Sequence, residues 1–200
     1  MSEARRFVSR AGEKLDHALT EFNIDVQGLR CADLGCNVGG FTDVLLQRGA
    51  ASVIAVDTGY GTLAWTLRND DRVEVRERTN ALHADPPQEG VDLVVVDLGW
   101  TPQRKAMPAA VPWLVAGGRI VTLVKPHYEL DESQRRFLLK NGVLDDADAD
   151  AVVTATAQAM PSMGLVVEGR IWSPLRGGKS SRGGRKGNLE ALLHVRPEAS

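Results

Sequence analysis

Hydrophobic and polar positions along the chain follow two alternating patterns, one with the spacing of strands and one with the spacing of helices. Short runs rich in Val, Leu and Ile recur between segments in which apolar residues return every three or four positions. The runs predict strands at 30–34, 52–57, 72–76, 91–97, 119–124, 165–172 and 191–195. The helical spacing predicts helices at 8–22, 42–48, 63–67, 106–114, 133–139 and 146–160.

The order of these elements indicates the fold class. Strands that alternate with helices are typical of an α/β protein with a parallel sheet and helices on both faces. The run at 91–97 is nearly continuous Val and Leu, as expected of a central strand covered on both faces, and 165–172 and 191–195 form a closing pair. We therefore expect one Rossmann-like domain with a mostly parallel seven-stranded sheet. Residues 1–28 would form an N-terminal helix and linker, and 29–200 the core.

Two local signals locate the ends of predicted elements. Ser9 stands just before the first helical pattern, and a serine at this place can cap a helix by accepting a backbone N–H. Gly117 and Gly118 are expected to turn the chain into the strand at 119–124.

A glycine-rich segment follows the first predicted strand, which ends in Asp33. Its glycines, which allow tight turns and close approach to a ligand, are Gly35, Gly39 and Gly40. The second strand ends in Asp57, 22 residues after Gly35, near the spacing at which an acid accepts the hydroxyls of an adenosine ribose. Asn37 stands where the dinucleotide pattern requires its second glycine. The segment therefore favours an adenosyl ligand without a pyrophosphate and disfavours a nicotinamide dehydrogenase.

Composition limits the remaining possibilities. The chain has 200 residues, of which 43% are hydrophobic and 25% charged, as in one soluble globular domain. Its net charge of −2 gives no global electrostatic argument for nucleic acid. Cys31 and Cys36 lack further ligands nearby, so we expect free thiols in a reducing compartment and no metal. No apolar run is long enough to span a membrane, so we expect a cytoplasmic protein.

One segment departs from this average composition. Residues 176–187 contain five glycines, no acid and five positive charges, which are Arg176, Lys179, Arg182, Arg185 and Lys186. A solvated flexible loop is one interpretation. The position of the segment between the last two strands favours another, in which a basic loop beside the ligand edge pairs with nucleic-acid phosphates.

Two further strand ends carry charged residues. Asp97 closes the fourth predicted strand, and Lys125 follows the fifth, so both should lie at the carboxyl edge of the sheet beside the glycine-rich segment. Each alone could be an ordinary surface charge. Together they can hold and deprotonate a hydroxyl, provided that desolvation or neighbouring charge lowers the pKa of the lysine. Tyr128 either stacks on a base or packs as a loop aromatic.

Several blocks of sequence resemble a known family. The blocks 9–15, 39–50, 56–61, 67–70, 77–81 and 123–126 are similar to the TlyA (haemolysin A) branch of the FtsJ-type ribosomal RNA methyltransferases. The resemblance extends from about residue 8 to residue 195. It implies a Rossmann-like methyltransferase fold, S-adenosylmethionine as methyl donor and methylation of ribose 2′-hydroxyls in RNA.

The resemblance also implies site residues. The catalytic set would be Lys14, Asp97, Lys125 and Glu190. Lys125 would take or stabilise the hydroxyl proton, and Asp97 would orient Lys125. The residues expected to bind the cofactor are Asp33, Gly35, Gly39, Gly40, Phe41, Asp57 and Asn80. Asp57 would hold the cofactor ribose, and Asn80 would lie on the adenine side. Arg10 and the basic segment would bind RNA.

Departures from the family pattern leave other functions open. The usual N-terminal RNA-binding domain is not expected, because only seven residues precede the first similar block. The segment 98–102, which borders the target nucleotide in this interpretation, differs from the family, as does 36–38. A non-catalytic RNA-binding or ribosome-assembly protein is the alternative, although the intact catalytic set argues against it. A membrane-lytic protein is disfavoured by the lack of a membrane-binding segment.

Overall fold

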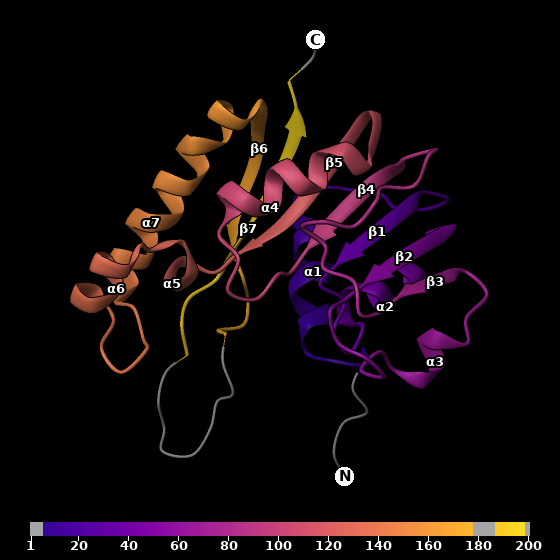
Figure 1. The fold of residues 1–200 in the computed structure, drawn as a ribbon, viewed down its shortest axis with the longest axis horizontal. Coiled ribbons are helices and arrows are strands. Elements are labelled where there is room, and N and C mark those ends of the chain that lie inside the picture. The colour runs from indigo at the N-terminus through magenta and orange to yellow at the C-terminus, as the bar shows by residue number, and fades with distance from the viewer. Residues whose placement is uncertain (1–5, 178–186, 199–200) are drawn as a thin grey trace.

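A seven-stranded sheet forms the centre of the computed structural model, which describes residues 6–177 and 187–198 (Figure 1). The strands are β1 (Arg30–Leu34), β2 (Ser52–Val56), β3 (Val73–Arg76), β4 (Val91–Val96), β5 (Leu114–Val124), β6 (Leu165–Trp172) and β7 (Ala191–Pro197). They lie in the order β3-β2-β1-β4-β5-β7-β6. The first five are parallel, and β7 is antiparallel to β5 and to β6. The predicted α/β fold and all seven predicted strands are confirmed.

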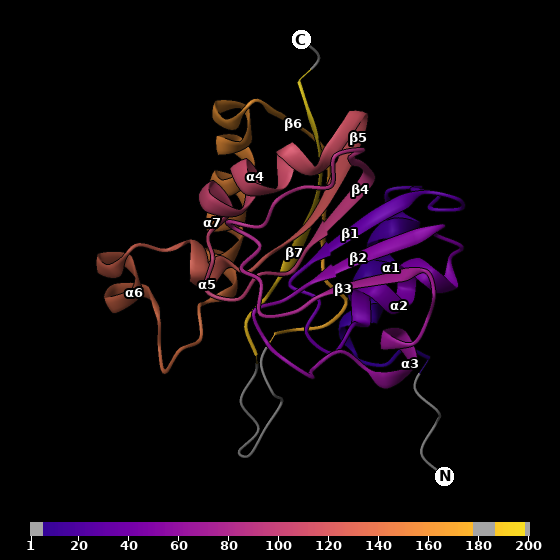
Figure 2. The same ribbon diagram turned by 45° about the vertical axis from the view of Figure 1, so that its right-hand side comes forward.

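Helices cover both faces of this sheet (Figures 1 and 2). The helices are α1 (Ala11–Glu21), α2 (Gly40–Gln47), α3 (Trp65–Arg68), α4 (Gln103–Ala110), α5 (Pro126–Glu129), α6 (Glu132–Leu138) and α7 (Asp146–Ala159), with 3₁₀ turns η1 (Val111–Trp113) and η2 (Met160–Met163). In both views α1 and α2 lie on one side of the strands, and α4 and α7 lie on the other. None of the helices in the described part is long and apolar enough to cross a membrane.

The central strand β4 shows how the sequence builds these two layers. Leu93 and Val95 pack into one buried cluster with residues of α1 and α2. Val94 and Val96 pack into a second cluster with residues of α4 and α7. Successive side chains of a strand point to opposite faces, so a continuous apolar run contributes to both cores. This packing holds the strand ends in a fixed order at the carboxyl edge of the sheet.

Two predictions about element ends are wrong. Arg10, with helical dihedral angles of φ −63° and ψ −14°, occupies the N-cap position of α1, and no side chain caps the helix there. The Ser9 hydroxyl accepts only a long 3.3 Å bond from the Ala11 N–H. The strand β5 begins at Leu114, which pairs with Val91, and not after Gly118. Gly117 and Gly118 still turn the chain, because they lie at the register shift between the Val91–Leu114 and Leu93–Arg119 pairs and Gly117 has a φ of +78°.

One helix was not predicted at all. The four residues of α5 follow directly on Lys125, and Pro126 is their first. A single helical turn is too short to show a 3.6-residue period in the sequence, and only its proline indicates a helix start. This turn matters because it lies between Lys125 and the rest of the C-terminal half.

Candidate active site

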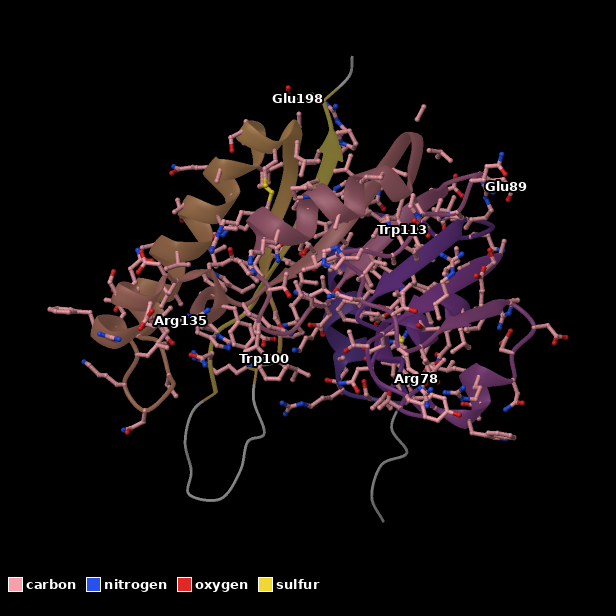
Figure 3. The ribbon with its side chains drawn as sticks, viewed as in Figure 1. Arg78, Glu89, Trp100, Trp113, Arg135 and Glu198 are labelled. Carbon is pink, nitrogen blue, oxygen red and sulfur yellow. The ribbon has the colours of Figure 1, made fainter. Side chains whose placement is uncertain are left out.

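A cavity of about 620 Å³ opens at the carboxyl edge of the parallel strands. The segments that follow β1, β2, β3, β4 and β5 all contribute to its wall. In Figure 3, Trp100 (after β4) and Arg78 (after β3) lie at this end of the sheet, whereas Glu89, which precedes β4, lies at the other. Doubly wound sheets bind ligands at this edge, and the volume suits a small-molecule cofactor.

A smaller cavity of about 90 Å³ continues from the first toward the start of α1. The two cavities share Gly35, Asn37 and Asp97 in their walls, and the smaller one is also lined by Ser9 and Ala11. The N-terminal segment therefore forms part of the site. We refer to both spaces together as the cofactor cavity.

Asp57 presents an oriented carboxylate to the cofactor cavity. Its Oδ2 accepts the backbone N–H of Asn37 at 2.9 Å, and its Oδ1 accepts that of Gly59 at 2.7 Å. Each carboxylate oxygen has further lone pairs that can accept a ligand hydroxyl. Asp57 thus fits the predicted role at a cofactor ribose.

The glycines shape the loop in two different ways. Gly35 has a φ of +96°, and a Cβ there would stand 2.5 Å from the carbonyl oxygen of Asp97. Gly39 has a φ of +98°, and its missing side chain leaves space for Leu63 and Leu67. Gly35 and Gly40 line the cofactor cavity, but Gly39 does not. The structure thus shows a packing role for Gly39 against Leu63 and Leu67.

Two other predicted cofactor residues support the loop from below. Asp33 is fully buried, and its Oδ2 accepts the backbone N–H of Thr42 at 2.9 Å and the hydroxyl at 2.7 Å. Burial raises the pKa of Asp33 to about 7. Phe41 lines the smaller cavity, but its side chain is 2% exposed and packs into the core. Asp33 lines neither cavity, so the structure places it behind the loop.

Asn80, another predicted cofactor residue, lies in the wall of the larger cavity. Its Oδ1 accepts the backbone N–H of Leu82 at 3.0 Å, which fixes the side chain in a turn. The Nδ2 group makes no hydrogen bond with another residue of the described chain, so it is the group that can face a ligand. Asn80 can therefore donate to an acceptor on a ligand through Nδ2.

The four residues of the predicted catalytic set form two ion pairs. Lys125 donates to Oδ1 of Asp97 in a short contact, and Lys14 Nζ lies 2.5 Å from Oε2 of Glu190. Lys14 and Glu190 are buried, with side chains 8% and 3% exposed. The charge of Glu190 also acts on Lys125, so the pairs are neighbours. The structure thus brings together residues from α1 and from the segments before β7, after β4 and after β5.

Lys125 does not have the lowered pKa that a basic amine at neutral pH requires. Burial lowers the pKa of Lys125, but the charge of Asp97, its hydrogen bond and the charge of Glu190 raise it by more, so it lies above its ordinary value. The condition under which Lys125 could deprotonate a hydroxyl, a lowered pKa, is therefore not met. Lys125 is therefore an ammonium group, able to donate hydrogen bonds to an oxygen.

An aromatic pair borders the cavity beside these charges. Trp100 is 80% exposed and has a φ of +54°, a conformation that non-glycine residues rarely adopt. Its ring lies 6.0 Å from that of Tyr128, and both residues line the cavity. Arg78 lies over the ring of Tyr60 at 4.1 Å, although neither residue lines the cavity. The sequence does not predict this contact, because it gives no signal for the left-handed conformation of Arg78.

The predicted RNA-binding residues are only partly described. Arg10 is exposed at the start of α1. The guanidinium of Arg176 donates two hydrogen bonds to the carboxylate of Asp146, both at 2.8 Å, and one to the carbonyl of Gly187. Arg176 thus fixes the base of the basic segment. The other positive residues, Lys179, Arg182, Arg185 and Lys186, lie outside the described residues. Within the described chain, no group of His, Cys, Asp and Glu could hold a metal ion.

The chain is similar to known proteins over nearly its whole length. The family model described as FtsJ-like methyltransferase matches residues 7–181. The 16S/23S rRNA (cytidine-2′-O)-methyltransferase TlyA of Mycobacterium tuberculosis is 44% identical over 97% of this chain and 70% of the relative. Hemolysin A of Brachyspira hyodysenteriae is 35% identical over 94% of this chain and 76% of the relative. A solved structure described as a hemolysin from Streptococcus thermophilus is 38% identical, with a TM-score of 0.87 over all of this chain and 70% of that one.

Together with the family match, the fold and the cavity at its carboxyl edge define a methyltransferase with S-adenosylmethionine as its cofactor. More distant structures share this fold, among them a ribosomal protein L11 methylase from Lactobacillus delbrueckii (TM-score 0.59, 16% identity, 96% of this chain and 81% of that one). The chain belongs to the FtsJ-like methyltransferase family.

Proposed function

We propose that this protein transfers the methyl group of S-adenosylmethionine to a ribose 2′-hydroxyl of RNA, with ribosomal RNA as its substrate. The single observation that carries the proposal is the ion pair of Lys125 and Asp97 in the wall of the cofactor cavity. The name of the M. tuberculosis relative, an rRNA (cytidine-2′-O)-methyltransferase, supports the substrate class. The whole chain would act as one methyltransferase domain in the cytoplasm.

Three residues would hold the cofactor. Asp57 would accept its ribose hydroxyls with the carboxylate that Asn37 and Gly59 orient. Asn80 would donate to the adenine through Nδ2, and Gly35 would let the backbone lie close to the ligand. When bound, S-adenosylmethionine supplies a methyl group made electrophilic by a positively charged sulfur.

Lys125 would act on the attacking oxygen as a hydrogen-bond donor. Its ammonium group can orient the 2′-hydroxyl and stabilise the negative charge that develops on the oxygen as its proton leaves, before the new bond to the methyl carbon uses that electron pair. The hydroxyl proton then needs another acceptor, because Lys125 already carries its own. Oδ2 of Asp97 accepts no hydrogen bond from another described residue and belongs to the carboxylate that Lys125 contacts, so we assign the proton to Asp97.

Lys14 and Glu190 would set the electrostatics of this pair. The charge of Glu190 helps to keep Lys125 protonated, and Lys14 balances that charge in the buried site. Positioning of the two reactants would supply much of the rate, as in other displacements between bound groups. The four residues therefore act as one unit, and loss of any one of them should reduce transfer.

Recognition of RNA would use the surface beside the cavity. Trp100 and Tyr128 can stack on an unpaired base next to the target ribose. Arg10 and the basic segment 176–187 would contact phosphates. The net charge of −2 means that this attraction is local.

Mapping of ribose methylation across total RNA tests the proposal. The map is compared between cells with the gene, cells without it and cells that carry only the Lys125→Met variant. We expect at least one ribosomal 2′-O-methyl group that is present only with the wild-type gene. A map that is the same in all three would contradict the proposal and favour a non-catalytic role in RNA binding.

A further inference from the structure

A third cavity, of about 230 Å³, lies on the C-terminal side of the reaction site between α4, α5, α6 and α7. Glu129, the last residue of α5, lines it together with Gln103, the first residue of α4. Neither residue belongs to the predicted catalytic set. The contact between them nevertheless joins the segment that follows Asp97 to the segment that follows Lys125.

The carboxylate of Glu129 holds the start of α4. Its two oxygens lie 2.9 and 3.1 Å from the backbone nitrogen of Gln103, which donates its N–H to them. The N-cap residue of α4 is Pro102, whose side chain makes no cap hydrogen bond. The first N–H groups of a helix need acceptors from outside the helix. Glu129 supplies, from a distant part of the chain, the acceptor that a proline cannot provide.

The side chain of Gln103 ties the same point to β5. Its Nε2 donates to the carbonyl of Leu123 at 3.2 Å, and its Oε1 accepts the hydroxyl of Thr122 at 2.9 Å. Gln103 is 3% exposed, so water does not compete for these bonds. Leu123 stands two residues before Lys125, and Glu129 four residues after it. Gln103 is thus hydrogen-bonded to one residue that precedes Lys125 in the chain and to one that follows it.

The segment 98–102 lies between this fixed point and Asp97, and it carries Trp100. The Trp100 ring makes a second contact with α5, through Tyr128. Arg135 of α6 also holds α5, since its guanidinium donates to the Tyr128 carbonyl at 3.2 Å; Figure 3 labels Arg135. Leu130, which follows α5, is 3% exposed in a small core. The short helix α5 therefore holds the segment 98–102 in place, through Tyr128 at Trp100 and through Glu129 at Gln103.

We propose that Glu129, acting through Gln103, is a positioning residue that fixes the Trp100 segment and Asp97 relative to Lys125. The proposal rests on the proposed function, because the reacting groups it aligns are those of methyl transfer. A displacement near 1 Å at a reacting group can cost about a hundredfold in rate. The contact between Glu129 and Gln103 is thus able to control turnover without touching substrate or cofactor.

The charge state of Glu129 offers a specific readout. Burial raises the pKa of Glu129 to about 7, although the Gln103 N–H and the charge of Arg104 oppose this rise. Arg104 is the other charged residue among those that line the cavity, since α6 and α7 contribute only uncharged residues such as Gln134 and Thr156. The Gln103 N–H therefore meets a charged acceptor above pH 7 and a neutral one below it. Hydrogen bonds to charged acceptors are the stronger ones.

The test compares three variants of the full chain in methyl transfer to RNA. Glu129→Ala removes the acceptor, Glu129→Gln keeps one acceptor oxygen without charge, and Glu132→Ala is the control. Glu132 is an exposed carboxylate on α6 that pairs only with Arg136 among the described residues. We expect Glu129→Ala to lower kcat by about ten- to a hundredfold with an unchanged KM for S-adenosylmethionine. Glu129→Gln should restore part of kcat and remove the dependence on pH near 7, and Glu132→Ala should match wild type.

A structural readout separates this proposal from the proposed function. Hydrogen exchange of peptides that cover 98–106 should be faster in Glu129→Ala than in wild type and Glu132→Ala. Wild-type kcat in Glu129→Ala would overturn the proposal, as would equal losses of kcat and cofactor affinity in both Glu129 variants, which indicate general damage. If the wild-type protein transfers no methyl group to RNA, the proposed function fails. In that case the positioning role is decided by hydrogen exchange alone, and exchange of 98–106 that is the same in Glu129→Ala and wild type overturns it.

Discussion

The buried ion pair of Lys14 and Glu190 joins α1 to the segment before β7, at opposite ends of the sequence. We expect Lys14→Met to lower the free energy of unfolding by about 3 kcal/mol, because removal of one partner leaves a buried charge without compensation, a loss of about 3–5 kcal/mol in comparable pairs. The lower end of that range applies because Lys125 already interacts with Glu190 and can replace part of the attraction. This loss is a large fraction of the roughly 5–15 kcal/mol by which domains are stable.

Urea unfolding of a double-mutant cycle measures this pair. The cycle contains Lys14→Met, Glu190→Leu and the double variant, with Glu132→Gln as a control for an exposed pair whose side chains are 79% and 83% exposed. The double variant should recover at least about 2 kcal/mol relative to the sum of the single losses, since neither charge remains buried alone. The control should change by less than about 0.5 kcal/mol. Single losses below about 1 kcal/mol without coupling would refute the assignment of a dry, paired site.

Three other outcomes follow from the structure. Burial raises the Asp33 pKa to about 7 from an ordinary 3.8, so between these pH values Asp33 is protonated in the folded state and ionised in the unfolded state. The free energy of unfolding should therefore fall as pH rises from about 4 to above 7. Urea unfolding of Asp33→Asn should show a weaker pH dependence, and an unchanged one would contradict this. Gly35→Ala should abolish cofactor binding in calorimetry, because its Cβ would meet the Asp97 carbonyl; wild-type affinity would contradict the loop geometry. Asp57→Ala should weaken cofactor binding at least tenfold with little effect on stability, and unchanged affinity would remove Asp57 from the site.

The sequence predicted the sheet well because its strands are strongly patterned. The run that became β4 is apolar at every position but one, and both core layers depend on it. The start of β5 was placed too late, since Gly117 and Gly118 are typical of a turn and only the pairing of Leu114 with Val91 keeps them in the strand. Local propensity cannot show such a tertiary effect.

The sequence predicted which residues of the catalytic set lie together but not the protonation state of Lys125. Lys125 and Asp97 could be placed at one edge from strand order alone. The direction of the Lys125 pKa shift depends on the balance between burial and two neighbouring carboxylates, and distances in space decide that balance. For the same reason, the distant hydrogen bond from Gln103 to Glu129 could not be seen in the sequence.

Methyl transfer by the purified protein tests the central claim most directly. Ribosomal RNA that lacks the modification is incubated with isotopically labelled S-adenosylmethionine, digested to nucleosides and separated by mass spectrometry. We expect the label in a 2′-O-methylnucleoside with wild-type protein, and a loss of at least about a hundredfold in Lys125→Met, whose cofactor affinity should stay within about threefold of wild type. Label on a base, or equal ribose methylation by Lys125→Met, would contradict the account.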